Sequence, residues 1–342
     1  MKKLFLLFIS VLFLSCGTSK TTTETKETTH SAESSVATNF ANSISVEDLK
    51  TNLYTLSSDE FEGRRLGEKG QKEAAKFIAD YYKNIGILPL QGYEDYMQEI
   101  PKEFFKGESN SASENVVAFI RGSEKAEEVL VISAHYDHLG LKGKEVYNGA
   151  DDDGSGTVAV MEIAKAFHKA KAAGKGPKRS ILFLHLTGEE EGLFGSKYYT
   201  SHPIFPLNYT VANLNIDMIG RIDEKHKKKP NYIYLIGSDK LSSELHNISE
   251  DVNKTYTQLK FDYTFNDDRD PNRFYYRSDH YNFAKNNIPV IFYFNGTHED
   301  YHQITDTPDK INYELLAKRT QLIFYTAWEV VNRENKLVVD KK

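Results

Sequence analysis

Residues 127–140, EEVLVISAHYDHLG, decide the fold. The segment is a near-continuous apolar run from 129 to 134, and it ends in the polar side chains of His135 and Asp137. A run of this kind is typical of a central strand in a parallel sheet, because both faces of such a strand are buried. We therefore predict a buried strand with chemically useful side chains at its carboxyl end.

The chain on either side alternates between strand-like and helix-like segments. The strand-like segments are 115–122, 179–192, 209–220 and 288–296. The helix-like segments are 45–58, with Ser45 as a cap, 69–86, an amphipathic 156–170, and 193–202. Strands that alternate with helices predict an α/β sheet covered on both faces, in one domain over 42–335.

The amino terminus predicts export. Two lysines precede an apolar run at 4–14, which is the pattern of a secretory signal peptide over 1–15. Cys16 is the single cysteine, and FLSC resembles a bacterial lipobox, which implies a lipid-modified Cys16. Residues 16–40 then predict a lipidated flexible tether rich in Thr, Ser and Glu, and 41–342 the folded domain. We expect an exported, lipid-anchored protein of the bacterial cell envelope.

The charge of the chain argues against nucleic acid as a partner. Hydrophobic residues make up 39% and charged residues 27% of the sequence, and the formal net charge is −6. Loss of the two positive charges of Lys2 and Lys3 with the signal peptide would take it to −8. An acidic chain is repelled by phosphate backbones.

A run of three aspartates stands in the stretch NGADDDGSGT, residues 148–157. Adjacent like charges repel, and the surrounding glycines weaken regular structure. Such a run is tolerated as a solvated turn, or where a cation neutralises it.

Metal-type side chains follow four of the predicted strands. In open α/β sheets, ligands bind outside the carboxyl ends of the strands. Zinc accepts imidazole nitrogen and carboxylate oxygen, and a pair of zinc ions needs a bridging carboxylate, which the aspartate run can supply. The candidates are His135 and Asp137; Glu189, Glu190 and Glu191; Asp217; and His298, Asp300, His302 and Asp306.

Five motifs in this order resemble the zinc metallopeptidases of family M28. They are SAHYDHLG, NGADDDGSGT, TGEEEGLFGS, NIDMIGR and DYHQITDTPDKI. The resemblance covers most of 42–335. It implies a mixed, mostly parallel central sheet sandwiched by helices, with two zinc ions at its carboxyl edge. It also implies a ligand set, in which His135 and Asp217 hold one zinc, Glu190 and His302 hold the other, and Asp152 bridges them.

The same resemblance implies roles around the metals. Glu189 corresponds to the general base, and Asp137 to a carboxylate that orients the imidazole of His135. Tyr301 either polarises the scissile carbonyl or is a packing aromatic. The segment 277–289 is similar to the family's segment before its last core strand, which would place Ser278, Asp279 and His280 near the cleft.

The remaining candidates have more ordinary interpretations. We expect Glu191 to be a solvated carboxylate at a helix start, and His185 to be a core histidine. We expect His138 and His298 to make hydrogen bonds within loops. Asp267, Asp268 and Asp270 form either a solvated acidic loop or a calcium site.

The predicted function is a zinc-dependent exopeptidase that acts on peptides, foremost an aminopeptidase. A carboxypeptidase or dipeptidase on the same metal core remains open. A glutaminyl cyclase shares the fold with a single zinc, but the full ligand set here favours hydrolysis. The alternative from another class is a non-catalytic binding protein that keeps the fold.

Overall fold

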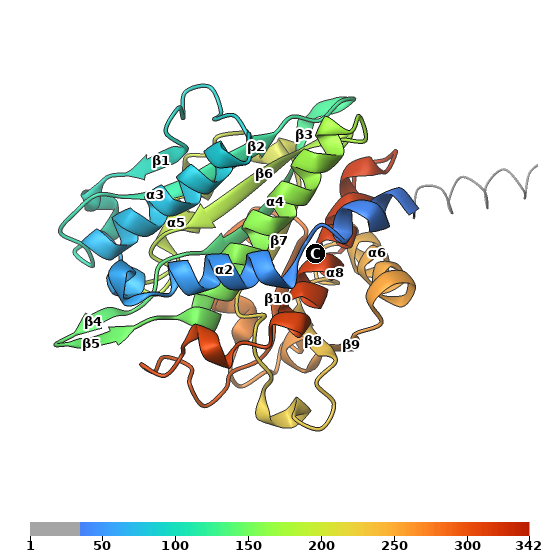
Figure 1. Cartoon of the computed structure of the whole chain (residues 1–342). Helices are drawn as coiled ribbons and strands as arrows, with labels where there is room; N and C mark the ends of the chain where they lie inside the picture. Colours follow the sequence, from blue (N-terminus) through green and yellow to red (C-terminus); the bar gives the residue numbers. More distant parts are fainter. Residues whose placement is uncertain (1–34, 342) are drawn as a thin grey trace, which may run out of the picture.

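An eight-stranded sheet runs through the described residues, 35–341, of this computed structural model (Figure 1). The strand order is β1-β2-β6-β3-β7-β10-β8-β9. Its strands are β1 (Met97–Ile100), β2 (Ser113–Ile120), β3 (Lys125–His135), β6 (Arg179–Leu186), β7 (Thr210–Ile216), β8 (Tyr232–Ile236), β9 (Lys260–Asp262) and β10 (Val290–Phe294). A separate hairpin consists of β4 (Gly140–Lys142) and β5 (Glu145–Tyr147).

The sheet is mixed and mostly parallel, which confirms the expected fold class. β3 pairs in parallel with β6 on one side and with β7 on the other, and β10 pairs in parallel with β7. The β1–β2, β2–β6 and β10–β8 pairs are antiparallel, and β8–β9 is parallel. The carboxyl ends of β6, β3, β7 and β10 therefore meet at one edge of the sheet.

Helices cover both faces of the sheet (Figure 1). Side chains of α2, α3, α4, α6 and α8 belong to the hydrophobic cluster on one face, and those of α5 and α7 to the cluster on the other. The helices are α2 (Val46–Leu56), α3 (Lys69–Asn84), α4 (Gly156–Ala172), α5 (Phe194–Ser201), α6 (Ser243–Val252), α7 (His280–Ala284) and α8 (Tyr313–Asn332).

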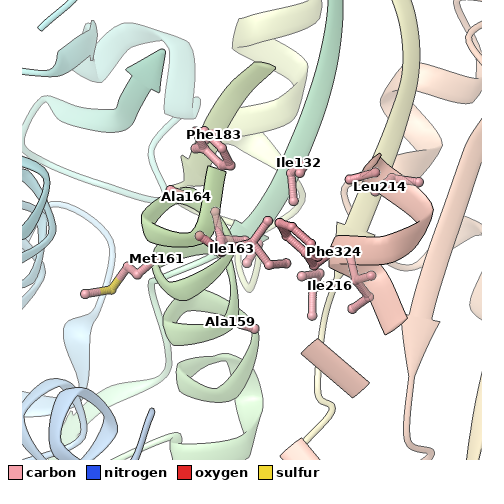
Figure 2. Packing of buried hydrophobic residues seen from close by; sticks show 14 of the residues in the cluster. Ile132, Ala159, Met161, Ile163, Ala164, Phe183, Leu214, Ile216 and Phe324 are labelled. Carbon is pink, nitrogen blue, oxygen red and sulfur yellow. The ribbon is translucent and has the colours of Figure 1, made fainter. Parts of the chain in front are cut away.

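The main core lies between the sheet, α4 and α8 (Figure 2). Ile132 of β3 and Phe183 of β6 face Ile163 of α4 there, and the ring of Phe324 from α8 closes the cluster. We expected an amphipathic helix at 156–170, but α4 is buried on nearly every side. The reason is that the sheet covers one side of α4, while α2 and α8 cover the others.

The predicted elements around the strand ends are confirmed. β6, β7 and β10 lie within the predicted strand segments, and β2 and β3 overlap theirs but each begin two residues earlier. α2, α3 and α5 lie within the predicted helices, and α4 extends two residues beyond its predicted end. The Oγ of Ser45 accepts a hydrogen bond from the backbone N–H of Asp48, as expected of an N-cap. β8, β9, α6 and α8 were not predicted.

The signal peptide, Cys16 and most of the tether lie outside the described residues. Residues 35–40, which we expected to belong to the tether, are helical. Ala37 is buried in the main core, and the ring of Phe40 stacks on Trp328 of α8 with centroids 6.0 Å apart. Within 35–341, no helix has the length and apolar character needed to cross a membrane.

Candidate active site

The parallel strands bring the predicted site residues to one edge of the sheet. His135 is the last residue of β3, and Asp217 directly follows β7. Glu189 and Glu190 lie in the loop after β6, and His302 lies in the loop after β10. These side chains are far apart in the sequence and meet because the four strands point in the same direction.

The three consecutive aspartates have different partners in the folded chain. They lie in a short helical turn, Ala150–Ser155, that opens α4. Oδ1 of Asp151 accepts a hydrogen bond from the N–H of Gly220 at 2.7 Å, and Oδ1 of Asp153 accepts one from the N–H of Met218 at 3.0 Å. Two of the three carboxylates therefore fasten the turn to the loop after β7, while Asp152 faces the cluster of imidazoles.

The side chain of Arg64 fixes the backbone that leads into this turn. Its buried guanidinium donates hydrogen bonds of 2.7–3.0 Å to the backbone carbonyls of Leu56, Tyr136, Asn148 and Gly149. Burial lowers the pKa of Arg64 to about 10, so the side chain stays charged at neutral pH.

Asp306 holds the turn from the other side. Its carboxylate accepts hydrogen bonds from the backbone N–H groups of Asp151 and Asp152, at 3.0 and 3.1 Å. Its backbone carbonyl accepts a third bond from the N–H of Ala150 at 3.1 Å. Because Asp306 belongs to the same loop as His302, it fixes the position of Asp152 relative to that histidine.

The two oxygens of Asp152 face two different imidazoles. Oδ1 lies 3.2 Å from Nε2 of His135, and Oδ2 lies 3.1 Å from Nε2 of His302. On the first side, Nε2 of His135 is also 3.7 Å from Oδ1 of Asp217. On the second side, Nε2 of His302 is 3.3 Å from Oε2 of Glu190. One carboxylate thus joins two groups of nitrogen and oxygen atoms.

These distances suit metal ligands. Two ligand atoms of a tetrahedral zinc, each about 2.0–2.1 Å from the ion, lie about 3.3 Å apart. Moreover, Oδ2 of Asp152 and Oε1 of Glu190 are buried and face imidazole nitrogens of His302 and His138 without a well-aligned hydrogen bond. Buried carboxylate oxygens that are not satisfied by a hydrogen bond are costly, and a cation between the side chains would satisfy them. The donor set therefore fits zinc.

Two further residues come within reach of the same positions. Ligand atoms of His135, Asp153 and Asp217 lie within 4.8 Å of one another, and so do those of His138, Asp152 and Glu190. We expected His138 to make a hydrogen bond in its loop, but its Nδ1 lies 2.7 Å from Oε1 of Glu190. Its burial behind Glu190 was not visible in the sequence.

His302 and His138 both lie close to Glu190, but they differ in their exposure to solvent. The side chain of His302 is 35% exposed and lines the cavity beside the cluster, whereas His138 is fully buried. A metal that meets substrate must be open to that cavity. His302 is therefore the better placed of the two histidines to hold it.

Asp137 acts on the backbone of the two glutamates. Its carboxylate accepts hydrogen bonds from the N–H groups of Glu189, at 3.1 Å, and of Glu190, at 3.3 Å. We expected this carboxylate to orient His135, but Nδ1 of His135 lies 3.8 Å from it and 3.2 Å from the backbone carbonyl of Asp137. Residue 137 still fixes the imidazole, through its main chain.

Ser278 approaches the site as the sequence implied. Its Oγ donates a 2.6 Å hydrogen bond to Oδ2 of Asp217 and accepts one from Nδ2 of Asn215 at 2.9 Å. The Asp217 carboxylate is therefore held by a hydrogen bond on one oxygen, while its Oδ1 faces His135.

Many ionisable side chains are buried together in this cluster, and this shifts their pKa values. Burial raises the pKa of Glu189 well above its usual range. Burial alone would lower the pKa of His302, but its contacts with Asp152 and Glu190 raise it to about 10. Without metal, a proton on the imidazole takes the place of a cation between these groups. Metal binding would displace that proton.

A cavity of about 390 Å³ opens beside the cluster. Asp152, Glu189, Glu190, Asp217 and His302 lie on its polar side. Its apolar wall is formed by Leu193, Met218, Phe274, Phe292, Phe294 and Tyr301. The ring of Tyr301 also stacks on the imidazole of His302, with centroids 3.9 Å apart.

His185 and His298 have the ordinary roles expected of them, and Glu191 does not. His185 is a buried core residue whose Nε2 meets the hydroxyl of Tyr82 at 2.6 Å, and Nε2 of His298 lies 3.1 Å from Oδ2 of Asp151. Glu191, expected to be solvated, has a side chain only 11% exposed, opposite Arg65. Burial raises the pKa of Glu191 to about 8.

The acidic loop at 267–270 does not gather its carboxylates. Asp267 pairs with Arg269 at 2.8 Å, and Asp268 pairs with Lys240. The carboxylate of Asp270 accepts the backbone N–H groups of Asn272 and Phe274. Each carboxylate has its own partner, which is the arrangement of an ordinary acidic loop.

Comparisons with known proteins agree with this geometry. The model of peptidase family M28 matches residues 115–327. Leucine aminopeptidase 2 of Trichophyton rubrum is 27% identical over 233 residues, which cover 67% of this chain and 41% of that protein. The chain spans less than half the length of the curated relatives it matches.

Solved structures share the fold at low identity. LapB from Legionella pneumophila matches with a TM-score of 0.67 and 21% identity, over 87% of this chain and 75% of that one. The glutaminyl cyclase of Porphyromonas gingivalis matches with a TM-score of 0.63 and 16% identity, over 83% and 97%. The fold is thus found in a solved glutaminyl cyclase and also in a solved aminopeptidase, that of Aneurinibacillus sp. strain AM-1. Because the family model covers most of the chain and includes every strand that carries the site, the chain belongs to peptidase family M28.

Proposed function

We propose that this protein is a two-zinc aminopeptidase, in which His135 and Asp217 hold one ion, Glu190 and His302 hold the other, and Asp152 bridges them. The observation that carries the proposal is the position of Asp152, whose two oxygens face two imidazole nitrogens at 3.2 and 3.1 Å. A structural ion pair would need only one of those contacts. The family membership and the aminopeptidases among the relatives support the same reading.

When bound, a pair of zinc ions supplies a nucleophilic water near neutral pH and polarises the scissile carbonyl. Glu189 lies in the cavity next to Glu190, so its carboxylate can take the proton of the attacking water and pass it to the leaving amine. Burial, which raises the pKa of Glu189, favours its holding that proton between the two transfers.

Neighbouring groups keep this machinery in place. Asp137 fixes the backbone of Glu189 and Glu190, and Ser278 fixes the carboxylate of Asp217. Tyr301 lines the cavity with its hydroxyl close to Nη2 of Arg277, at 3.4 Å. We assign Tyr301 the role of a hydrogen-bond donor to the carbonyl oxygen of the substrate.

The charges of the site indicate which end of a peptide substrate is trimmed. The ammonium group of a peptide is attracted by the carboxylates around the cluster, and the apolar wall of the cavity can accept the first side chain. A carboxypeptidase or dipeptidase would use the same metal core. We further propose that the mature protein is anchored to a bacterial envelope membrane through a lipid on Cys16.

The test uses the chain from residue 17, loaded with zinc and incubated with a mixed peptide pool. Mass spectrometry should show loss of amino-terminal residues that a chelator abolishes. Glu189→Gln should lower kcat by at least about 10²-fold while the zinc content stays near two per chain. Glu191→Gln is the matched control and should retain activity. Trimming from the carboxyl end would overturn the specificity, and formation of pyroglutamate without trimming would favour a cyclase.

A further inference from the structure

The cavity beside the metal cluster contains two cationic side chains. Lys197 extends from α5, and Arg277 follows the short helical turn Phe274–Tyr276. Among the described residues, no carboxylate lies within ion-pair distance of either cation. The Nζ of Lys197 donates to the backbone carbonyl of Gly192, and Nη2 of Arg277 donates to Tyr301. Both charges are therefore available to a ligand.

The charge balance of the cavity leaves these two cations uncompensated. Its carboxylates are those of Asp152, Glu189, Glu190 and Asp217. If the site holds two divalent ions, as the proposed function requires, these four negative charges are neutralised. Lys197 and Arg277 then make the loaded cavity positive, although the chain as a whole is acidic. Such a cavity attracts anionic ligands.

Arg277 is already oriented for planar recognition. Its guanidinium lies over the ring of Phe274, with Cζ 4.9 Å from the centroid, and its Nη2 is tied to the hydroxyl of Tyr301. A guanidinium fixed in this way can offer its remaining N–H groups to both oxygens of a carboxylate. Lys197 adds a point charge from the α5 side of the same cavity.

We propose that Lys197 and Arg277 select peptides that carry a carboxylate just beyond the scissile bond. The inference rests on the proposed function, because it needs an amino-terminal substrate orientation. The substrate ammonium is repelled by the two cations, so the opposite end of the peptide lies toward Lys197 and Arg277. That carboxylate is either the carboxyl terminus of a dipeptide or an acidic side chain of the second residue.

The size of the cavity agrees with a short peptide. Its volume of about 390 Å³ is at the low end of the roughly 300–1,000 Å³ that is usual for small-molecule sites. A dipeptide with an apolar first residue would place its side chain against Phe292 and Phe294 and its carboxylate near Arg277. The favoured substrates would then be dipeptides.

The experiment compares leucyl-alanine with leucyl-alaninamide on the zinc-loaded chain. We expect kcat/KM to be about tenfold higher for the free acid at low ionic strength, and this ratio to fall as salt is added. Arg277→Gln should bring the ratio toward one. Arg273→Gln is the matched control, because Arg273 lies on the same segment but outside the cavity, over the ring of Tyr276. It should keep the wild-type ratio.

A second pair of substrates separates the two sources of the carboxylate. If leucyl-aspartamide is cleaved faster than leucyl-asparaginamide while the first pair is cleaved equally, the recognised carboxylate is the side chain. Binding is measured separately, by isothermal titration of leucyl-alanine and its amide into the Glu189→Gln variant, and should show the same preference as kcat/KM.

The outcomes distinguish this inference from the proposed function. Equal kcat/KM within both pairs, together with equal binding of leucyl-alanine and its amide, would overturn the role of Lys197 and Arg277 and leave the aminopeptidase intact. A preference for the free acid that persists in Arg277→Gln would also overturn the role of Arg277. Absence of hydrolysis of all four substrates by the zinc-loaded chain would overturn the proposed function itself.

Discussion

Arg64→Met is expected to cost about 3–5 kcal/mol of the free energy of unfolding. The buried guanidinium donates four hydrogen bonds to backbone carbonyls, two of them at the start of the aspartate turn. Methionine fills much of the same space but donates nothing. If each carbonyl left without its donor costs about 1 kcal/mol, the sum is about 4 kcal/mol. The variant also removes a positive charge that interacts electrostatically with Asp137 and Asp306.

The assay is urea denaturation of the wild type and the variant, each in zinc and in chelator. Arg65→Met is the control, because Arg65 is adjacent in the sequence and its side chain is 43% exposed. We expect the control to change the free energy by no more than about 0.5 kcal/mol. Because Arg64 holds the turn that carries Asp152, the loss should also reduce the stabilisation gained from zinc. A loss below about 1 kcal/mol for Arg64→Met would refute the reasoning.

Three further predictions concern the same edge of the sheet and one distant charge. His302→Asn should leave about one zinc per chain by mass spectrometry. His138→Asn should keep two zinc ions, with the affinity for zinc weakened about tenfold. Equal loss of zinc in the two variants would contradict the assignment of His302 as the ligand. Asp306→Asn should weaken zinc about 10–100-fold in competition with a chelator, because one oxygen no longer accepts the backbone N–H groups of the turn. Burial alone would raise the pKa of Asp262, but hydrogen bonds lower it to about 2. The ionised carboxylate therefore contributes to the stability of the folded protein above pH 4, and this contribution is lost toward pH 2. Between pH 2 and pH 4, the free energy of unfolding of the metal-free Asp262→Asn variant should therefore change less steeply with pH than that of the metal-free wild type. An unchanged slope would argue against this.

The strands that carry the site could be predicted because their signal is local. A continuous apolar run such as 129–134 is compatible with little besides a buried strand, and each polar motif directly follows one of these runs. Four parallel strands must end at one edge, so the motifs had to meet once the strands were identified. That is why His135, Asp217, Glu190 and His302 could be named together.

Elements beyond the motifs were missed for the opposite reason. β8 and β9 are short strands at one border of the sheet, and α8 is helical over twenty residues that are apolar on most sides. Periodicity does not separate a helix buried all round from a buried strand. α4 was predicted as a helix, but its burial on nearly every side by α2, α8 and the sheet was not.

The sequence by itself determined the strands that carry the site and the helices between them, the chemistry at each of those strand ends, and the aspartate run as the source of a bridging carboxylate. Asp152 could be named as that bridge only through the resemblance to family M28, and the tertiary structure supplies the physical reason, since Asp151 and Asp153 are engaged by backbone N–H groups of a loop about 65 residues away. Only the tertiary structure brought Arg64 and Asp306 against the turn. The physical reason is that hydrogen bonds to backbone groups carry no sequence signature, so a residue that holds the main chain of a distant loop is recognised only when the chain is folded.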